Sequence, residues 1–236
     1  MELFDDHRPA LGVTEIAELT GLNRSTCHRF CQTLKSIGYL EEVDRRPLRP
    51  GLKAVSLARA ALSSRELPEL AMPYLQELRN AVNEAMNMSL LDGTEIVYVA
   101  RILSNHLITL RLYVGSRLPA YATSMGRVIL AYLSEAEADA VLDRSDLRLL
   151  TEHTITDRSR LKAELRLIEA RGVMPSTIRR WRLESEAWPL QSWPPVVGRL
   201  PPSTSRSRDE IEDVLAPQLL RTAHTISALV QQVGLD

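Results

Sequence analysis

Residues 14–38 read TEIAELTGLNRSTCHRFCQTLKSIG and hold two helical patterns that meet at Gly21. Glycine takes a positive φ at no steric cost, so a sharp turn is expected there. Thr14 is expected to cap the first helix and Asn23 the second. The second helix has apolar residues at the spacing of one helix face. These residues are Cys27, Phe30, Cys31 and Leu34.

The other face of the second helix carries polar and basic side chains, which are Arg24, Ser25, Thr26, His28, Arg29, Gln32 and Thr33. Arginine and glutamine can form paired hydrogen bonds with base edges in the major groove of DNA. Two short helices with such an outer face are typical of a helix–turn–helix unit. We expect Arg29 and Gln32 to contact bases.

A short hairpin is predicted after the second helix, with YLEEV at residues 39–43 and a turn at residues 44–46. It would form the wing of a winged helix, and Arg45, Arg46 and Arg49 are expected to contact the DNA backbone. Residues 24–59 contain eight Lys or Arg and three acidic residues, in a chain of net charge −1. Concentrated positive charge favours phosphate binding over the alternative of an ordinary surface helix pair.

The composition is that of a globular protein with one or two domains, since 44% of the 236 residues are hydrophobic and 25% are charged. A net charge near zero argues against a protein that coats polyanions. No apolar run approaches membrane-spanning length, and no signal peptide precedes the first helix. We therefore expect a cytoplasmic protein with no membrane partner.

The only two cysteines are Cys27 and Cys31, with His28 beside them. Both sulfurs fall on the apolar helix face, where free cysteine behaves as a small hydrophobic residue. No metal and no cofactor is expected, and i,i+4 spacing disfavours a disulfide. The five histidines are scattered and no catalytic motif is present, so the chain is not expected to be an enzyme.

The remainder of the chain predicts a larger α+β domain. The segment 53–66 begins with an Ala/Leu-rich helix that would link the two domains. Residues 88–99 predict a β-hairpin around Asp92-Gly93, and residues 107–114 a further strand that includes Arg111. The loop 115–124 leads into a helix over 125–133, with Ser124 as its N-cap. A helix start of this kind can bind a carboxylate, although it can equally be a simple connector.

The chain resembles the IclR family of bacterial transcriptional regulators. The residues that carry the resemblance are TEIAELTGLNRSTCHRF in the first helix pair, DGTEIVYVAR at 92–101, GSRLPAYATSMGRVILAYL at 115–133 and IEDVLAPQLLRTAHTISALVQQ at 211–232. The sequence of residues 118–131 is similar to that of the family members that regulate aromatic-acid breakdown through protocatechuate and β-ketoadipate. The family implies a winged helix–turn–helix over residues 1–52, a linker helix over 53–66 and a GAF-like effector domain with an antiparallel sheet over 67–236.

The resemblance also implies partners and a ligand site. Family members form homodimers or homotetramers on palindromic double-stranded promoter sites. The effector, here a small aromatic or dicarboxylic acid, would lie between the sheet and a loop at 120–126. The expected effector-binding residues are Arg111, Ala120, Tyr121, Ala122, Thr123, Ser124, Met125 and Gly126. The alternative is an oligomeric small-molecule-binding protein without specific DNA recognition.

Two features depart from the family pattern. Relatives carry another turn or two of helix before the position of Met1, so the first domain is expected to be clipped. Residues 173–202 hold all three tryptophans and six of the thirteen prolines, which predicts an incomplete sheet there. This segment is either a divergent insertion or a reading-frame error that impairs effector binding. Permitted codons from Val173, read in another frame, give YALDDQEMEIGVRSMAVAV, which resembles the family's pattern.

Overall fold

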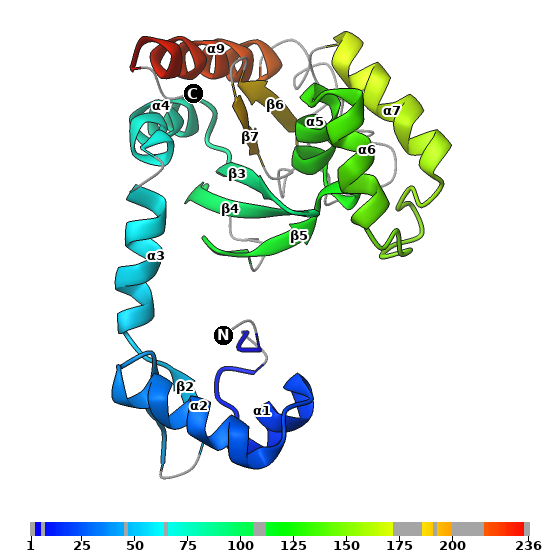
Figure 1. Ribbon diagram of the computed structural model, residues 1–236. Coiled ribbons are helices and arrows are strands. Elements are labelled where there is room, and N and C mark those ends of the chain that lie inside the picture. The colour runs from blue at the N-terminus through cyan, green and yellow to red at the C-terminus, as the bar shows by residue number, and fades with distance from the viewer. Residues whose placement is uncertain are drawn as a thin grey trace. The chain divides into compact units, whose positions relative to one another are not determined.

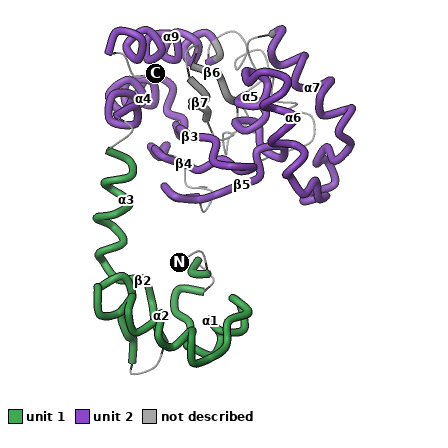
Figure 2. The backbone as a smooth tube through the Cα atoms, viewed as in Figure 1, with its two compact units in different colours: residues 1–65 green, residues 66–236 purple. Residues whose placement is uncertain are grey.

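The structure is a computed structural model that describes residues 3–5, 8–44, 47–63, 66–105, 112–171, 186–190, 193–199 and 215–233. The chain divides into two compact units, residues 1–65 and residues 66–236 (Figure 2). Each unit combines helices with a small antiparallel sheet, which confirms the α+β fold class. No helix in the described ranges has both the length and the hydrophobicity that crossing a membrane requires.

Unit 1 contains the predicted helix–turn–helix and wing. Its elements are α1 (Val13–Thr20), α2 (Arg24–Ser36), β1 (Leu40–Glu42), β2 (Leu48–Pro50) and α3 (Lys53–Ser63). Gly21 ends α1 with φ 68°, and the Asn23 side chain caps α2 by accepting from the Thr26 N–H at 2.8 Å. The prediction of Thr14 as the α1 cap is wrong, because the cap is Gly12 and the helix begins two residues earlier than predicted, at Val13. The carboxylate of Glu15 accepts from the Gly12 N–H at 2.6 Å.

The core of unit 1 lies where α1, α2 and the hairpin meet. Its buried residues are Leu11, Ile16, Ala17, Cys27, Cys31, Leu40 and Leu48. The prediction that Phe30 joins this core is wrong, since its side chain is 59% exposed. Phe30 lies roughly 60° around the helix from Cys27, away from the line of Cys27 and Cys31. The hairpin is antiparallel and pairs Glu41 with Arg49.

Unit 2 is built around a five-stranded antiparallel sheet with the order β5-β4-β3-β7-β6. The strands are β3 (Met86–Asp92), β4 (Glu95–Ile102), β5 (Arg117–Pro119), β6 (Glu186–Leu190) and β7 (Trp193–Arg199). The helices are α4 (Leu67–Val82), α5 (Ser124–Tyr132), α6 (Glu135–Arg144), α7 (Arg158–Arg171) and α9 (Ala216–Val233), with a short 3-10 helix η1 (Ala120–Ala122). Figure 1 shows the sheet between α4 and α9 on one side and α5, α6 and α7 on the other.

The β3–β4 hairpin confirms the turn predicted at Asp92-Gly93, where Gly93 has φ 66°. The strand predicted over 107–114 is not confirmed. Residues 112–114 are not in a strand, and residues 107–111, with Arg111, lie outside the described residues. The next described strand is instead β5, in a segment predicted to be loop, where Arg117 pairs with Val97 of β4.

The prediction of an incomplete sheet around residues 173–202 is wrong for the described part of that segment. Strands β6 and β7 form there, and β7 pairs with β3 through residues 196–199. The prolines do not interrupt this pairing because of where they lie. Pro189 is on the edge strand β6, and Pro194 and Pro195 precede the residues that pair with β3. Edge strands and strand ends are the positions where a sheet tolerates proline.

Candidate DNA-binding and effector sites

The outer face of α2 is exposed along its length. Ser25, His28, Arg29 and Gln32 are all exposed and follow one another at i, i+3, i+4 and i+7, which places them on one stripe. Arg24 and Thr33 are exposed beside this stripe, while Thr26 is half-buried near the helix start. The stripe therefore presents hydrogen-bond donors and positive charge to any partner of α2.

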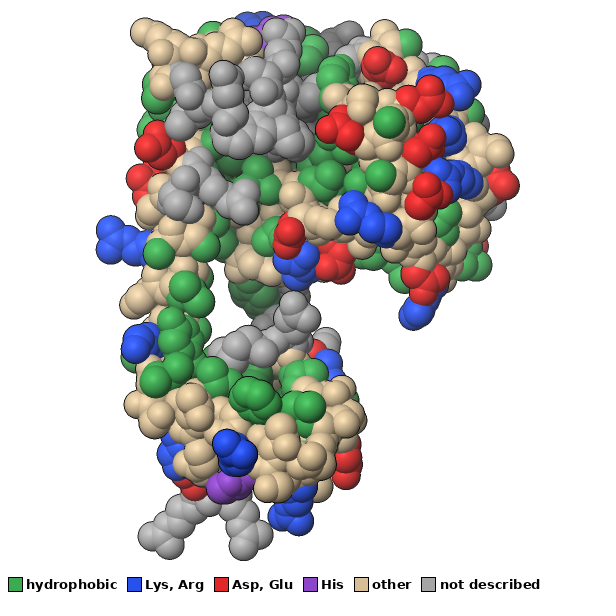
Figure 3. All heavy atoms as spheres, viewed as in Figure 1, with side chains coloured by type: hydrophobic (Ala, Val, Ile, Leu, Met, Phe, Trp, Pro, Cys, Tyr) green, Lys and Arg blue, Asp and Glu red, His purple; other side chains and the backbone are tan. Residues whose placement is uncertain are grey.

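The charges of Arg24 and Arg29 on α2 are not compensated within the described part of the chain. Arg24 and Arg29 form no ion pair with a described residue, whereas Lys35 is paired with Glu42 and Arg49 with Glu41 at 2.5 Å. Arg45 and Arg46 lie outside the described residues. Figure 3 shows Lys, Arg and His side chains on the surface of unit 1. Arg24 and Arg29 are therefore available to pair with DNA phosphates or bases. Arg49 already forms an ion pair with the carboxylate of Glu41.

The two cysteines lie behind this face and are buried. Their sulfur atoms are 4.0 Å apart, and burial, with the hydrogen bond to Cys27, raises the pKa of Cys31 to about 11. A raised pKa leaves the thiol protonated and unreactive near neutral pH. No group of three or more His, Cys, Asp or Glu side chains suited to a metal ion occurs among the described residues.

The start of α5 forms the centre of the predicted effector site. The prediction of Ser124 as N-cap is wrong, because Thr123 has the extended backbone of a cap, with φ −114°, and its hydroxyl accepts from the Gly126 N–H at 3.0 Å. Ser124 is the first helical residue and is 6% exposed. The first turn of α5 therefore lies inside the protein, where a helix N-terminus favours negative charge.

A close backbone contact holds this helix start against η1. A Cβ added at Gly126 would lie 2.2 Å from the carbonyl oxygen of Ala120. Ala120 is fully buried, and its N–H donates to the carbonyl of Thr94 at 3.0 Å. Packing therefore requires glycine at position 126. This close contact explains the glycine without any role in binding the effector.

Tyr121 also has a structural role. Its hydroxyl donates to the Arg148 carbonyl and accepts from the Arg148 N–H, both at 2.9 Å. Its ring is 3% exposed and packs in a core cluster with Met125, Ile96 and others. The hydroxyl is thus engaged by the protein, while Ala122 and Thr123 are half-buried beside it.

Three residues that sequence reasoning missed lie on the α5 face of the sheet. Ser89 pairs with Tyr98, which packs in the same core cluster as Met125 of α5. Side chains that are directly opposite in an antiparallel pair share one face, and alternate residues share it too. Asn87 and its partner Arg101 therefore face α5 as well. The signal was the alternation in Met86-Asn87-Met88-Ser89, which gives β3 a polar and an apolar face.

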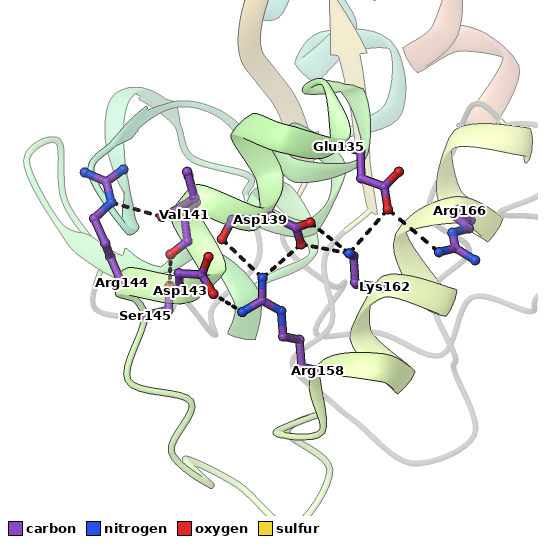
Figure 4. Close-up of polar contacts among 10 residues, drawn as sticks. Glu135, Asp139, Val141, Asp143, Arg144, Ser145, Arg158, Lys162 and Arg166 are labelled. Carbon is purple, nitrogen blue, oxygen red and sulfur yellow. Dashed lines mark hydrogen bonds and ion pairs between the residues drawn. The ribbon is translucent and has the colours of Figure 1, made fainter.

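A network of ion pairs joins α6 to α7 (Figure 4). Arg158 binds Asp139 at 2.9 Å and also Asp143, while Lys162 binds Asp139 at 2.9 Å and Glu135 at 3.3 Å. Hydrogen bonds from Lys162 and Arg158 lower the pKa of Asp139. A depression of about 370 Å³ borders this network, but the charges of Lys162 and Glu135 at its rim are already paired. The network therefore fastens α6 to α7.

Comparison with known proteins gives two matches to family profiles. Residues 1–44 match the IclR helix-turn-helix domain, and residues 59–177 match the bacterial transcriptional regulator IclR C-terminal domain. The second match covers half of the chain and stops four residues beyond Val173. The helix–turn–helix expected from residues 14–38 is thus supported independently of its geometry.

Individual relatives agree with these matches. The chain is 35% identical over 173 residues to the Pca regulon regulatory protein of Pseudomonas putida, which is 73% of this chain and 59% of that protein. A crystal structure of a transcriptional regulator from Rhodococcus sp. RHA1 has 36% identity and a TM-score of 0.82, and covers 98% of this chain and 95% of that one. An IclR homologue from Microbacterium hydrocarbonoxydans, complexed with 4-hydroxybenzoate, has the same fold, with 22% identity, a TM-score of 0.80 and coverage of 98% and 95%.

Proposed function

The chain belongs to the IclR family of bacterial transcriptional regulators, and on that premise we propose that it binds specific promoter DNA through α2 under the control of a small aromatic carboxylic acid. Arg29 and Gln32 contact base edges, and the wing contacts phosphates. The operator is palindromic and is bound by a homodimer or homotetramer. The protein acts in aromatic catabolism and has no catalytic activity of its own.

The observation that carries the DNA-binding role is the exposed stripe on α2. Ser25, His28, Arg29 and Gln32 project from one face of a capped helix in a helix–turn–helix unit, and Arg29 has no carboxylate partner among the described residues. A recognition helix reads the major groove with a few such side chains near its N-terminal half. A helix that served only for packing would have no need of this face.

The effector role rests on the start of α5. The carboxylate of the acid binds at Ser124 and Met125 in the first helical turn, where the helix dipole favours an anion. Thr123 fixes the turn through its cap on Gly126, and Tyr121 holds η1 in place through Arg148. The names of the relatives support an aromatic acid, since one regulates a Pca regulon and a structural neighbour holds 4-hydroxybenzoate.

Fluorescence anisotropy with the DNA upstream of the protein's own gene tests the DNA-binding role. The protein should bind this DNA at least roughly a thousandfold more tightly than a scrambled sequence of equal length. Binding should also weaken steeply as salt rises, because each phosphate contact releases a counterion. Equal binding to both sequences, together with a melting shift in the presence of aromatic acids, would favour the small-molecule-binding protein without specific DNA recognition.

A further inference from the structure

Two polar side chains of β3 are buried on the face towards α5 and lack a hydrogen-bond partner among the described residues. Asn87 and Ser89 are both 0% exposed. Neither the oxygen nor the nitrogen of the Asn87 amide, nor the hydroxyl of Ser89, forms a hydrogen bond with any described residue. Buried polar groups are nearly always hydrogen-bonded, because leaving them unpaired is costly. Two such side chains at alternate positions of one strand indicate a site for a polar group of a ligand.

These side chains lie on the face of the sheet that is turned towards α5. Ser89 is opposite Tyr98, which belongs to the same core cluster as Met125, the second residue of α5. Asn87 lies two residues before Ser89 on the same face of β3, so both project from the sheet towards α5. The unpaired groups and the buried helix start are therefore two independent features of one region.

The chemistry of the two side chains selects the kind of group that they bind. An amide offers both donors and an acceptor, and a serine hydroxyl offers one donor and accepts as well. A hydroxyl group of a ligand can donate and accept at once, so it can satisfy both residues. A carboxylate can only accept, and neither neutral side chain would compensate the charge of a buried carboxylate.

We propose that Asn87 and Ser89 bind a hydroxyl group of the effector, and thereby select a monocarboxylic hydroxyaromatic acid over a dicarboxylic acid. This proposal rests on the effector function proposed above. The single carboxylate of the ligand goes to the start of α5, at the other end of the ring.

The test compares benzoate, 4-hydroxybenzoate and terephthalate by isothermal titration calorimetry on the full chain. Wild-type protein should bind 4-hydroxybenzoate about tenfold more tightly than benzoate, as expected for one well-placed hydrogen bond. Terephthalate should bind more weakly than 4-hydroxybenzoate. In Asn87→Leu and in Ser89→Ala, the preference for 4-hydroxybenzoate should fall while the affinity for benzoate is retained.

Thermal melting without ligand supplies a second readout and a matched control. Ser89→Ala should keep or raise the melting temperature, because it removes an unpaired hydroxyl. Ser145→Ala should lower it, because the Ser145 hydroxyl donates to the Val141 carbonyl at 2.8 Å. The control variant should keep the wild-type ratio of affinities. If Asn87→Leu does not fold, Ser89→Ala alone decides the test.

The outcomes separate this proposal from the effector function on which it rests. If wild-type protein binds the acids but both variants keep the full preference for 4-hydroxybenzoate, the hydroxyl assignment is overturned and the effector site stands. Tightest binding of terephthalate by wild-type protein would overturn the assignment in the same way. If wild-type protein binds none of the three acids, the effector function fails, and the role of Asn87 and Ser89 fails with it.

Discussion

We propose that single side chains on α2 decide how this protein distinguishes one DNA sequence from another. Arg29 is exposed, has no ion-pair partner among the described residues and lies on the same stripe as Gln32. Substituting Arg29→Ala should cost about 1–3 kcal/mol of binding free energy on the cognate site and much less on a scrambled one. Anisotropy titrations on both DNA sequences measure this difference.

The comparison variant is Arg46→Ala, between β1 and β2 in the sequence. Phosphate contacts position the protein without reading sequence, so this change should weaken binding to both DNA sequences alike. It should also reduce the slope of log K against log salt concentration by about one, because one phosphate contact is lost. The division of roles between Arg29 and Arg46 is wrong if each variant loses the same free energy on both sequences.

At the scale of residues, the sequence identified two residues of the helix–turn–helix whose role depends on local geometry, but it misplaced the caps of α1 and α5. Gly21 and Asn23 could be predicted because a helix end and a helix start each demand a particular residue type. Asn87 and Ser89 could not, because a polar strand face normally indicates exposure to solvent. Only the cover of that face by α5 makes them buried. Phe30 was misassigned because it lies at the edge of the apolar face of α2.

Helices α6 and α7 are joined by charged side chains whose state depends on pH. Hydrogen bonds from Lys162 and Arg158 lower the pKa of Asp139 below its usual value. A carboxyl group with a lowered pKa stabilises the fold above its unfolded pKa of about 3.9, and this contribution is lost as pH falls through its folded value. We expect the melting temperature of the wild-type protein to fall below about pH 4, in part because Asp139 becomes protonated.

The variant Asp139→Asn tests this contribution. It should melt at a lower temperature than wild type near pH 7, since Lys162 and Arg158 lose their shared partner. Its melting temperature should also change less between about pH 6 and pH 3. Parallel pH profiles for the two proteins would show that the pairing of Asp139 does not stabilise the fold. Circular dichroism melting at several pH values gives both curves.

Elements were predicted well where the pattern was local and poorly where it depended on the sheet. The β3–β4 hairpin followed from an Asp92-Gly93 turn between alternating segments. Strand β5 is three residues long, too short to show an alternating pattern, and is defined by its pairing with β4. The proline content of β6 and β7 argued against strands there. Proline is tolerated because β6 lies at the edge of the sheet, which the sequence does not reveal.

The whole molecule combines two units whose sequences match one family. The amino-acid composition changes near residue 173, where tryptophan and proline become frequent. The match to the family's C-terminal domain ends at residue 177, where the tryptophan- and proline-rich segment has just begun. We propose that a reading-frame error accounts for both facts. Resequencing the gene across codons for residues 170–206 should find one base inserted or deleted near each end of the segment. Recovery of the same codons would show a divergent insertion instead.

We propose that an acid bound at the start of α5 controls the affinity of α2 for DNA. The most direct measurement is the Kd for the upstream DNA, by anisotropy at one fixed salt concentration, with and without saturating 4-hydroxybenzoate. We expect a change in Kd of roughly 5- to 150-fold, and an equal change in the Kd for the acid when DNA is bound, since coupling is reciprocal. An acid that binds the protein and leaves the Kd for DNA unchanged would show that α5 does not control α2.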